Sequence, residues 1–408
     1  MNKSYLSLLV MILLSFFLMI DTYITPAILE QLSAYYDIET YIFGWANALF
    51  LILGSIVGLF IGHYADKKGR KYIFVLVVFI GELACLLTGI TYFNSSIYYF
   101  FLFRILSGIG VGGVYPLIFS FVAECISQRH RAKINASIDI AWGLGMMAGP
   151  ALATYCIANN LGWHTTFLYA ALPSFPLLIL FCFLYEDSFN TKKSKRVVKG
   201  SYKHIVFLNK TNLLIFLQGI PGSIPWGILP FWLILFLQQD KGLSSTDSLL
   251  VWESFGVAAV LGGFLWAFLG DKIYNYKPHL LLFTCSFFVC LGIVPSYILI
   301  NSSHSELPLI LLLTVLSGSC VAIAGPNIKA ILMNSNCTNE CNRVFSIYNL
   351  MDNIGKALGP AIGSLLLMYS YDLVTALNIG ISFWLVSALL LFICGLTFKA
   401  KAKAKAKA

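Results

Sequence analysis

Long apolar runs separated by short polar segments fill almost the whole chain. A helix that crosses a bilayer needs about 20 apolar residues, and each run has roughly that length. We interpret each run as one membrane span, and an even number of spans places both ends of the chain on one side of the membrane. Twelve runs are present: 5–26, 41–63, 73–92, 97–123, 134–158, 164–185, 211–237, 248–269, 279–300, 307–333, 343–368 and 373–397.

The first run, 5–26, could also be the apolar part of a secretory signal peptide. That part is usually roughly 7–15 residues long and precedes a small-residue cleavage site. The run here is longer, lacks such a site and contains Asp21. We therefore interpret it as a span.

Composition points to the same fold class. Of the 408 residues, 59% are hydrophobic and 11% are charged, whereas soluble domains have about 25% charged residues. The mean hydropathy is +0.82. These values exclude an ordinary cytosolic enzyme, a disordered protein and a secreted disulfide scaffold. The sequence predicts an all-α membrane protein with twelve transmembrane helices in two pseudo-symmetric six-helix bundles.

Most of the 27 lysine and arginine residues fall in predicted loops on the N-terminal side of the membrane. Only Lys241 lies in a predicted loop on the other side. The positive-inside rule then places both termini in the cytoplasm, and we expect a multi-pass protein of a bacterial cell (inner) membrane. The net charge of +9 reports this orientation. It does not indicate nucleic-acid binding, because the basic residues are scattered over short loops.

The longest hydrophilic stretch divides the chain into two halves. We expect an N-terminal six-helix bundle at 1–185, a basic cytoplasmic linker at 186–210, a C-terminal six-helix bundle at 211–397 and a Lys-Ala cytoplasmic tail at 398–408. The linker could bind anionic lipid head groups, although a solvated linker explains its charges more simply.

The two halves share the motif GxxxGP in corresponding spans. Duplication of a six-helix unit explains such matched positions. Glycines four residues apart let helix backbones approach closely, so we expect the motif to serve helix packing and gating. Its residues are Gly145, Gly149 and Pro150 in the fifth span and Gly355, Gly359 and Pro360 in the eleventh.

The loop after the second span carries the most specific local motif. It begins at Gly62, and Asp66 can pair with a cation or a helix N-terminus. Gly69 can turn the chain, while Arg70 and Lys71 can bind acidic groups on a neighbouring helix. We expect these residues to form a conformational latch. The motif matches the signature GxxxD(R/K)xGR(R/K), and the chain resembles the major facilitator superfamily in this loop, its twelve spans and its basic central loop.

A finer resemblance is to the spinster-like branch of that superfamily, whose better-known members export lysolipids and sphingoid phosphates. The similar segments are 217–227, 239–244, 325–327 and 352–356, together with 21–26, which is similar to the first-span Asp-Arg-Tyr pattern of that branch.

Two positions depart from the pattern of the branch. Thr22 replaces the Arg that follows the Asp, and Val111 replaces a fourth-span Glu. The segment that starts at Arg104 instead resembles the fourth span of sugar and metabolite porters. The resemblance therefore leaves the lipid substrate open, and with it a proton step through that Glu.

Ionisable residues inside spans usually face a cavity or a partner. Arg104 stays protonated, so it must meet an anion or a group of carbonyls. The resemblance implies that spans one and four border the central cavity, which makes Asp21 the natural carboxylate. A change in their separation would alter the proton affinity of Asp21, so we predict that this pair couples transport to protons. No motif surrounds Glu82.

The second half holds further candidates for the substrate path. Asp352 and Lys356 are four residues apart with the acid first, the favourable order for an ion pair. They could neutralise each other or gate a cavity. Gln218 and Trp226 lie beside the Pro and Gly residues of span seven. They could line the path, or the span could be a gating kink without substrate contact.

Other chemistries are not indicated. The ten cysteines show no paired spacing, so we expect free thiols and no metal site. Gly108, Gly110 and Gly113 spell GxGxxG, but the dinucleotide motif needs a preceding strand, and here it lies in a continuous apolar run. The sequence contains no Walker loop and no catalytic motif, so we expect neither an enzyme nor a cofactor.

These observations predict a secondary active transporter that works by alternating access and is coupled to protons. Its partners would be a small organic solute or amphiphile, protons and the lipid bilayer, without nucleic acid, and it would function as a monomer. The span-five GxxxGP motif resembles an antiporter signature and favours export. Uptake of an organic acid or sugar-like metabolite is the alternative, and a non-transporting membrane receptor is a third possibility.

Overall fold

The computed structural model describes residues 3–93, 96–125, 128–185, 209–303, 306–336 and 338–398, and every regular element within them is a helix. The chain divides into two compact units, Met1–Ser201 (unit 1) and Tyr202–Ala408 (unit 2). Most of the predicted linker, 186–210, and nearly all of the predicted tail, 398–408, lie outside the described residues.

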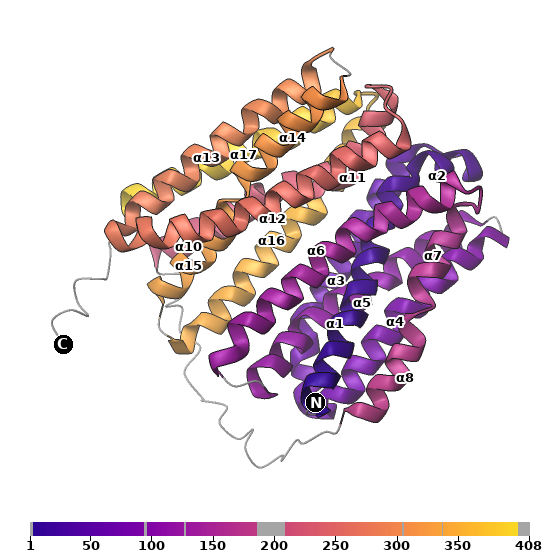
Figure 1. Cartoon of the computed structure of the whole chain (residues 1–408), viewed down its shortest axis with the longest axis horizontal. Coiled ribbons are helices and arrows are strands. Elements are labelled where there is room, and N and C mark those ends of the chain that lie inside the picture. Colours follow the sequence, from indigo (N-terminus) through magenta and orange to yellow (C-terminus); the bar gives the residue numbers. More distant parts are fainter. Residues whose placement is uncertain are drawn as a thin grey trace. The chain divides into compact units, whose positions relative to one another are not determined.

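Unit 1 is drawn from indigo to magenta in Figure 1. Its elements are α1 (Lys3–Ile24), the 3-10 turn η1 (Thr25–Ile28), α2 (Leu29–Tyr36), α3 (Thr40–Lys68), α4 (Arg70–Ile90), the 3-10 turn η2 (Thr91–Phe93), α5 (Ile97–Cys125), α6 (Gln128–Ala158), α7 (Trp163–Ala171) and α8 (Ser174–Leu184).

Unit 2 is drawn from red to yellow in the same figure. Its elements are α10 (Lys210–Ser223), α11 (Pro225–Gln239), α12 (Ser245–Tyr276), α13 (Pro278–Asn301), α14 (Leu307–Val321), α15 (Ala324–Ser335), α16 (Thr338–Met368) and α17 (Leu373–Thr397).

Eleven helical segments among the described residues are long and apolar enough to cross a membrane. The other predicted span is α16, which has 31 residues but contains Asp352 and Lys356 and is less apolar. The all-α membrane fold expected from the sequence is therefore confirmed.

The first span is longer than predicted, because helical residues continue through Tyr5–Tyr36 instead of ending near residue 26. Pro26 lies in the first positions of η1, where its missing N–H costs no helical hydrogen bond. The chain then continues into α2 until Asp37, whose positive φ of 54° closes that helix.

Span seven is divided into two helices. Pro221 lies inside α10, and α11 begins at Pro225, with Ile224 between the two helices. Proline cannot donate a backbone hydrogen bond, which explains a break at this point. Among the described residues, the first span also contains two α-helices, α1 and α2, as do the spans formed by α7 with α8 and by α14 with α15.

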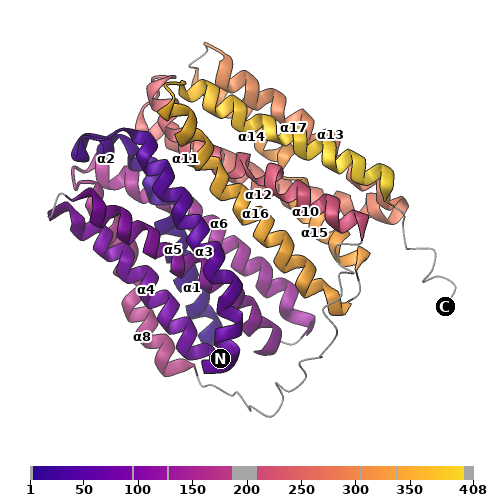
Figure 2. The ribbon, with the colours of Figure 1, turned by 180° about the vertical axis from the view of Figure 1, so that it is seen from behind.

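Glycines determine how closely the helices of unit 1 pack. A Cβ at Gly112 on α5 would lie 1.8 Å from the carbonyl oxygen of Gly54 on α3, and one at Gly110 would lie 2.8 Å from the Cα of Gly81 on α4. The views in Figures 1 and 2 agree that α3 and α5 run side by side. The GxGxxG letters therefore lie inside a helix and serve helix packing.

Candidate functional site

A buried ion pair lies inside unit 1. Nη1 of Arg104 on α5 donates to Oδ1 of Asp21 on α1. Nη2 of Arg104 donates to the backbone oxygen of Asp21 at 3.2 Å. Asp21 is 0% exposed and Arg104 is 3% exposed. An unpaired charge at membrane depth is costly, so this double contact explains how Arg104 is accommodated.

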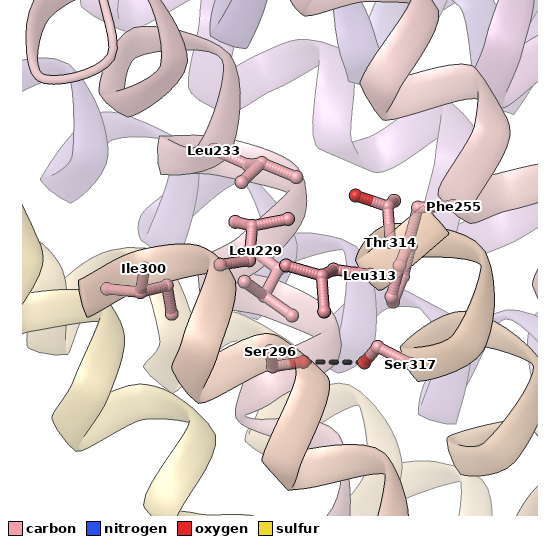
Figure 3. A pocket seen from close by; sticks show the side chains of 9 residues that line it. Leu229, Leu233, Phe255, Ser296, Ile300, Leu313, Thr314 and Ser317 are labelled. Atoms are coloured by element: carbon pink, nitrogen blue, oxygen red, sulfur yellow. Dashed lines mark hydrogen bonds between the residues drawn. The ribbon is translucent and has the colours of Figure 1, made fainter. Parts of the chain in front are cut away.

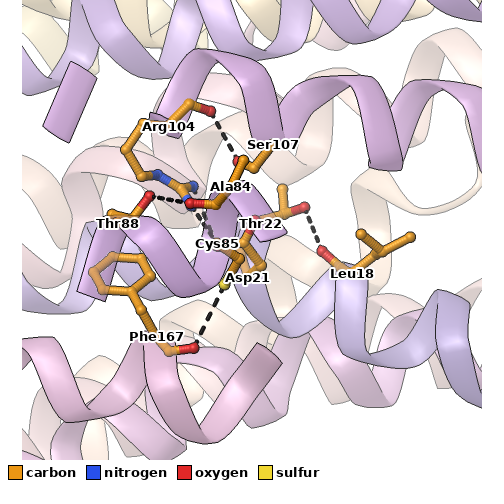
Figure 4. Close-up of polar contacts among 9 residues, drawn as sticks. All are labelled: Leu18, Asp21, Thr22, Ala84, Cys85, Thr88, Arg104, Ser107 and Phe167. Atoms are coloured by element: carbon orange, nitrogen blue, oxygen red, sulfur yellow. Dashed lines mark hydrogen bonds and ion pairs between the residues drawn. The ribbon is translucent and has the colours of Figure 1, made fainter. Parts of the chain in front are cut away.

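Aromatic rings hold the guanidinium group of Arg104 in place. Its Cζ lies 5.1 Å from the ring centre of Phe50 on α3 and 5.3 Å from that of Phe167 on α7. A guanidinium near an aromatic face is stabilised by the charge distribution of the ring. Figure 4 shows Arg104, Asp21 and Phe167 converging from different helices. Four helices therefore orient one cation.

A second carboxyl group lies beside this pair, and no sequence motif singles it out. Glu82 on α4 is 1% exposed and interacts electrostatically with Asp21. Within the described part of the chain, neither oxygen of Glu82 nor Oδ2 of Asp21 has a hydrogen-bond partner. The only available signal was a Glu within an apolar run, because its neighbours come from other helices.

The thiol of Cys85 also belongs to this centre. It is buried, lies one turn after Glu82 on α4, and donates to the backbone oxygen of Phe167 at 3.6 Å. It interacts electrostatically with Asp21, Glu82 and Arg104. Figure 4 shows the thiol and its bond to Phe167 next to the ion pair.

A separate charged cluster lies in unit 2. Nζ of Lys356 and Oδ2 of Asp352 are 2.8 Å apart, as expected for residues one helical turn apart on α16. Ser223 at the end of α10 donates to the other oxygen, Oδ1. Lys329 on α15 interacts electrostatically with Asp352. Side-chain exposures of 42% for Lys356 and 26% for Asp352 leave this cluster open on one side.

The two predicted residues of span seven are held inside unit 2. Gln218 is 3% exposed, and its Nε2 donates to Oγ of Ser387 on α17 at 2.8 Å. The ring of Trp226 packs against Phe255 on α12 and Trp384 on α17, with ring centres 5.5 and 6.2 Å apart. Their part in a substrate path stays a prediction.

The predicted latch is described in part. Gly69 has a φ of 93° and is the single residue between α3 and α4. Nη1 of Arg70 donates to the oxygen of Ser120 on α5 at 3.3 Å. Nζ of Lys71 donates to the oxygens of Cys182 and Tyr185 at the end of α8, both at 2.6 Å.

Gly62 and the side chain of Asp66 lie outside the residues whose side chains the structure describes. The role of the acidic member of the latch therefore stays a prediction.

The two GxxxGP motifs occupy corresponding places in the two units. A Cβ at Gly145 or Gly149 would lie 2.6 Å from the oxygen of Phe16 or Ile20, both on α1. In unit 2 the motif of α16 packs against span seven in the same way. A Cβ at Gly355 would lie 2.4 Å from the oxygen of Ile220, and one at Gly359 would lie 2.3 Å from the nitrogen of Ile228.

Pro150 and Pro360 follow these glycines inside unbroken helices, α6 and α16. In each unit the motif therefore lies inside one continuous helix, at the surface where that helix contacts the first span of the unit.

A small apolar pocket lies inside unit 2 between α11, α12, α13 and α14 (Figure 3). The hydroxyl groups that line it already form hydrogen bonds within the protein. The Oγ atoms of Ser296 and Ser317 are 2.5 Å apart, and Oγ1 of Thr314 donates to the backbone oxygen of Ile310 at 2.7 Å. The pocket offers no charge that could orient a polar solute. Among the described residues, no group of His, Cys, Asp and Glu could hold a metal ion.

These features define the class: an integral, multi-pass, all-helical membrane protein whose two units carry matched motifs. The family model described as the Major Facilitator Superfamily matches residues 11–335 and 254–408. The chain therefore belongs to this superfamily of secondary transporters, and it is not an enzyme.

Individual relatives and structures agree with this assignment. A Haemophilus influenzae protein whose name refers to metabolite transport is 26% identical over 353 residues, 82% of each chain. Multidrug resistance protein MdtG of a Rahnella species is 24% identical over 359 residues, 83% of each chain. The crystal structure of an inward-facing, occupied bacterial homologue of the human lysosomal transporter Spinster has a TM-score of 0.81 at 15% identity and covers 97% of both chains. This last likeness shows the fold alone.

Proposed function

We propose that this protein is a proton-coupled transporter that moves a small organic solute or amphiphile by alternating access, with export as the favoured direction. The observation that carries the proposal is the Asp21–Arg104 ion pair, which is buried inside one helical bundle of a transport family. A carboxylate that gains and loses its cation during a transport cycle changes its affinity for protons. That change is the minimum needed for coupling.

Export is supported by the GxxxGP motif of α6 and by the likeness to a multidrug resistance protein. A second candidate is uptake of an organic acid. The cluster in unit 2 favours it, because Lys329 and Lys356 place two cationic side chains beside the carboxylate of Asp352. An anionic substrate group would be attracted to such a site.

A transport screen tests the proposal. Purified protein in proteoliposomes and inside-out membrane vesicles would be offered labelled lysolipids, cationic amphiphilic drugs, carboxylic acids and sugars, with and without a pH gradient. Export predicts gradient-driven accumulation of the labelled solute in the lumen of inside-out vesicles. Uptake predicts instead that solute already loaded into these vesicles moves out of the lumen. A receptor would exchange no solute in either preparation.

Variants of Asp21 test the coupling. Asp21→Asn should keep counterflow, which needs no net proton movement, and lose accumulation driven by a pH gradient. Glu306→Gln makes the same kind of change at an exposed carboxylate and should keep both activities. Accumulation by Asp21→Asn with unchanged pH dependence would exclude Asp21 as the coupling residue.

A further inference from the structure

The buried centre of unit 1 contains two carboxyl groups and one cation. Arg104 stays protonated and binds Asp21, so it compensates one negative charge. Glu82 and Asp21 interact as like charges when both are ionised. Two neighbouring carboxylates in a poorly solvated site do not both stay ionised when a single cation is present. The centre is therefore electrically neutral when it holds one proton.

The contacts indicate which carboxyl group holds that proton. Oδ1 of Asp21 accepts from Arg104, as expected of a carboxylate. Neither oxygen of Glu82 accepts a hydrogen bond within the described part of the chain. Of the helices packed against α4, α1 presents Asp21, α5 presents Arg104 turned toward Asp21, and α8 begins at Ser174, whose hydroxyl lies beside Glu82. On α4 itself the titratable neighbour is Cys85.

Among the described residues of α3 and α7, no titratable group interacts with Glu82. Close helix packing next to Glu82 also excludes water. A Cβ at Gly81 would lie 2.7 Å from the Cα of Gly110 on α5 and 3.2 Å from the side chain of Leu18 on α1. An ionised Glu82 would thus have neither a cation nor solvent to stabilise it.

We propose that Glu82 is the residue that holds the proton in this centre, while Arg104 keeps Asp21 ionised. That this proton is the transported one rests on the function proposed above. Oδ2 of Asp21 has no hydrogen-bond partner among the described residues, so it is an open acceptor. When Arg104 exchanges Asp21 for Glu82, the O–H bond of Glu82 breaks as one forms on Asp21, and the guanidinium group compensates the negative charge that is now on Glu82. One proton moves, and no other reactant is needed.

Infrared spectroscopy tests the protonation without any substrate. At neutral pH the full-length protein in lipid nanodiscs should show the C=O band of a protonated carboxylic acid that shifts in D₂O. Glu82→Gln should lose this band, and isotope labelling of the glutamate carboxyl carbons should lower its frequency in the wild type, while the exposed control Glu306→Gln should keep it. An unchanged band in Glu82→Gln would overturn the proposal. So would a band that the glutamate label leaves unshifted, because the proton would then lie on Asp21.

Transport by the same variants separates this proposal from the proposed function. The probe is the compound with the largest gradient-driven flux in the screen. Glu82→Gln should lose accumulation and keep counterflow whose rate no longer varies with pH, whereas Glu82→Asp should restore part of the pH dependence. Wild-type accumulation by Glu82→Gln would overturn the role of Glu82 and leave the role of Asp21 standing. If the wild type ignores the pH gradient while Glu82 still holds a proton, the proposed coupling fails and the protonation assignment stands.

Discussion

Two carboxyl groups of unit 1 are equally buried but have different surroundings. Asp21 meets a guanidinium group through a side-chain oxygen and its backbone oxygen, whereas Glu82 meets no cation among the described residues. The planar guanidinium makes both bonds while lying near the rings of Phe50 and Phe167. A lysine ammonium group has no such planar fork. The type of cation is therefore part of the site.

A double-mutant cycle tests the ion pair at this scale. Removing one partner of a buried pair leaves an uncompensated charge and costs about 3–5 kcal/mol. We expect Arg104→Gln and Asp21→Asn each to lower the thermal midpoint in detergent clearly, and the double variant to lower it less than the sum. Thermal unfolding followed by tryptophan fluorescence measures this coupling. Strictly additive losses would show that the two side chains do not stabilise each other.

Arg104→Lys provides a second test at the residue scale. Lysine keeps the charge but cannot reproduce the forked contact with Asp21. We expect counterflow between that of the wild type and that of Arg104→Ala, which should impair both counterflow and accumulation. Rates are measured per amount of folded protein. Equal counterflow rates for Arg104→Lys and Arg104→Ala would show that a positive charge at this position, without the forked contact, does not support transport.

At the scale of helices, glycine decides which backbones can touch. The motif glycines Gly149 and Gly359 lie against the backbones of α1 and α11, where an added Cβ would overlap with other atoms. Gly263 on α12 is different, since a Cβ there would meet nothing within 4 Å. The same residue type therefore has a packing role at two of these positions and none at the third.

This difference provides a matched set of variants. Gly149→Leu and Gly359→Leu should abolish transport and lower thermal stability, because overpacking costs about 1–3 kcal/mol or more. Gly263→Leu should leave expression and flux near those of the wild type. Flux and thermal unfolding are measured on all three variants. Wild-type transport by Gly149→Leu and Gly359→Leu would refute the close-packing interpretation.

Lys71, which follows the second span, stabilises the C-terminal end of another helix, α8. Lys71 donates to two carbonyl oxygens at the end of α8, at Cys182 and Tyr185, where a positive charge also suits the helix dipole. Lys71→Gln should lower stability by about 1 kcal/mol, measured as a lower thermal midpoint. Lys68→Gln, at an exposed position on α3, is the control. Equal midpoints for the two variants would remove Lys71 from the stabilising contacts.

At the scale of the whole molecule, the distribution of the basic residues predicts the orientation of the chain in the membrane. Lys241, the exception to their bias, lies between α11 and α12, where it donates to the oxygen of Ser302 and lies 5.5 Å from the ring centre of Phe236. Partial burial lowers the pKa of Lys241, an effect that neighbouring Asp240 opposes. The cation that departs from the predicted bias is thus held by contacts within the fold, and the prediction of cytoplasmic termini rests on the other basic residues.

Reporter fusions test the orientation. We expect alkaline phosphatase fused after Gly242 to be active and the same enzyme fused after Lys277 to be inactive. Green fluorescent protein at the C-terminus should fluoresce, as it does in the cytoplasm. Enzyme activity and fluorescence per amount of fusion protein are measured. The opposite pattern would place both termini outside the cytoplasm.

The sequence by itself determined the helical spans, the matched glycine motifs and the family. Apolar runs, the residues that break helices and the GxxxGP repeats depend only on neighbours along the chain, so they can be read before folding. The partnership of Asp21 and Arg104 was also predicted, because a buried guanidinium group must have an anion and the family resemblance places spans one and four beside the central cavity.

Only the tertiary structure decided what surrounds Glu82. In the sequence it is one Glu within an apolar run, like Glu253. Its position beside Asp21 arises because α1, α4 and α5 meet closely at Gly81 and Gly110. Similarly, the carbonyl oxygens bound by Lys71 belong to a helix more than 100 residues later. Such contacts depend on how distant segments pack, and that information is not contained in the local pattern of apolar and polar residues.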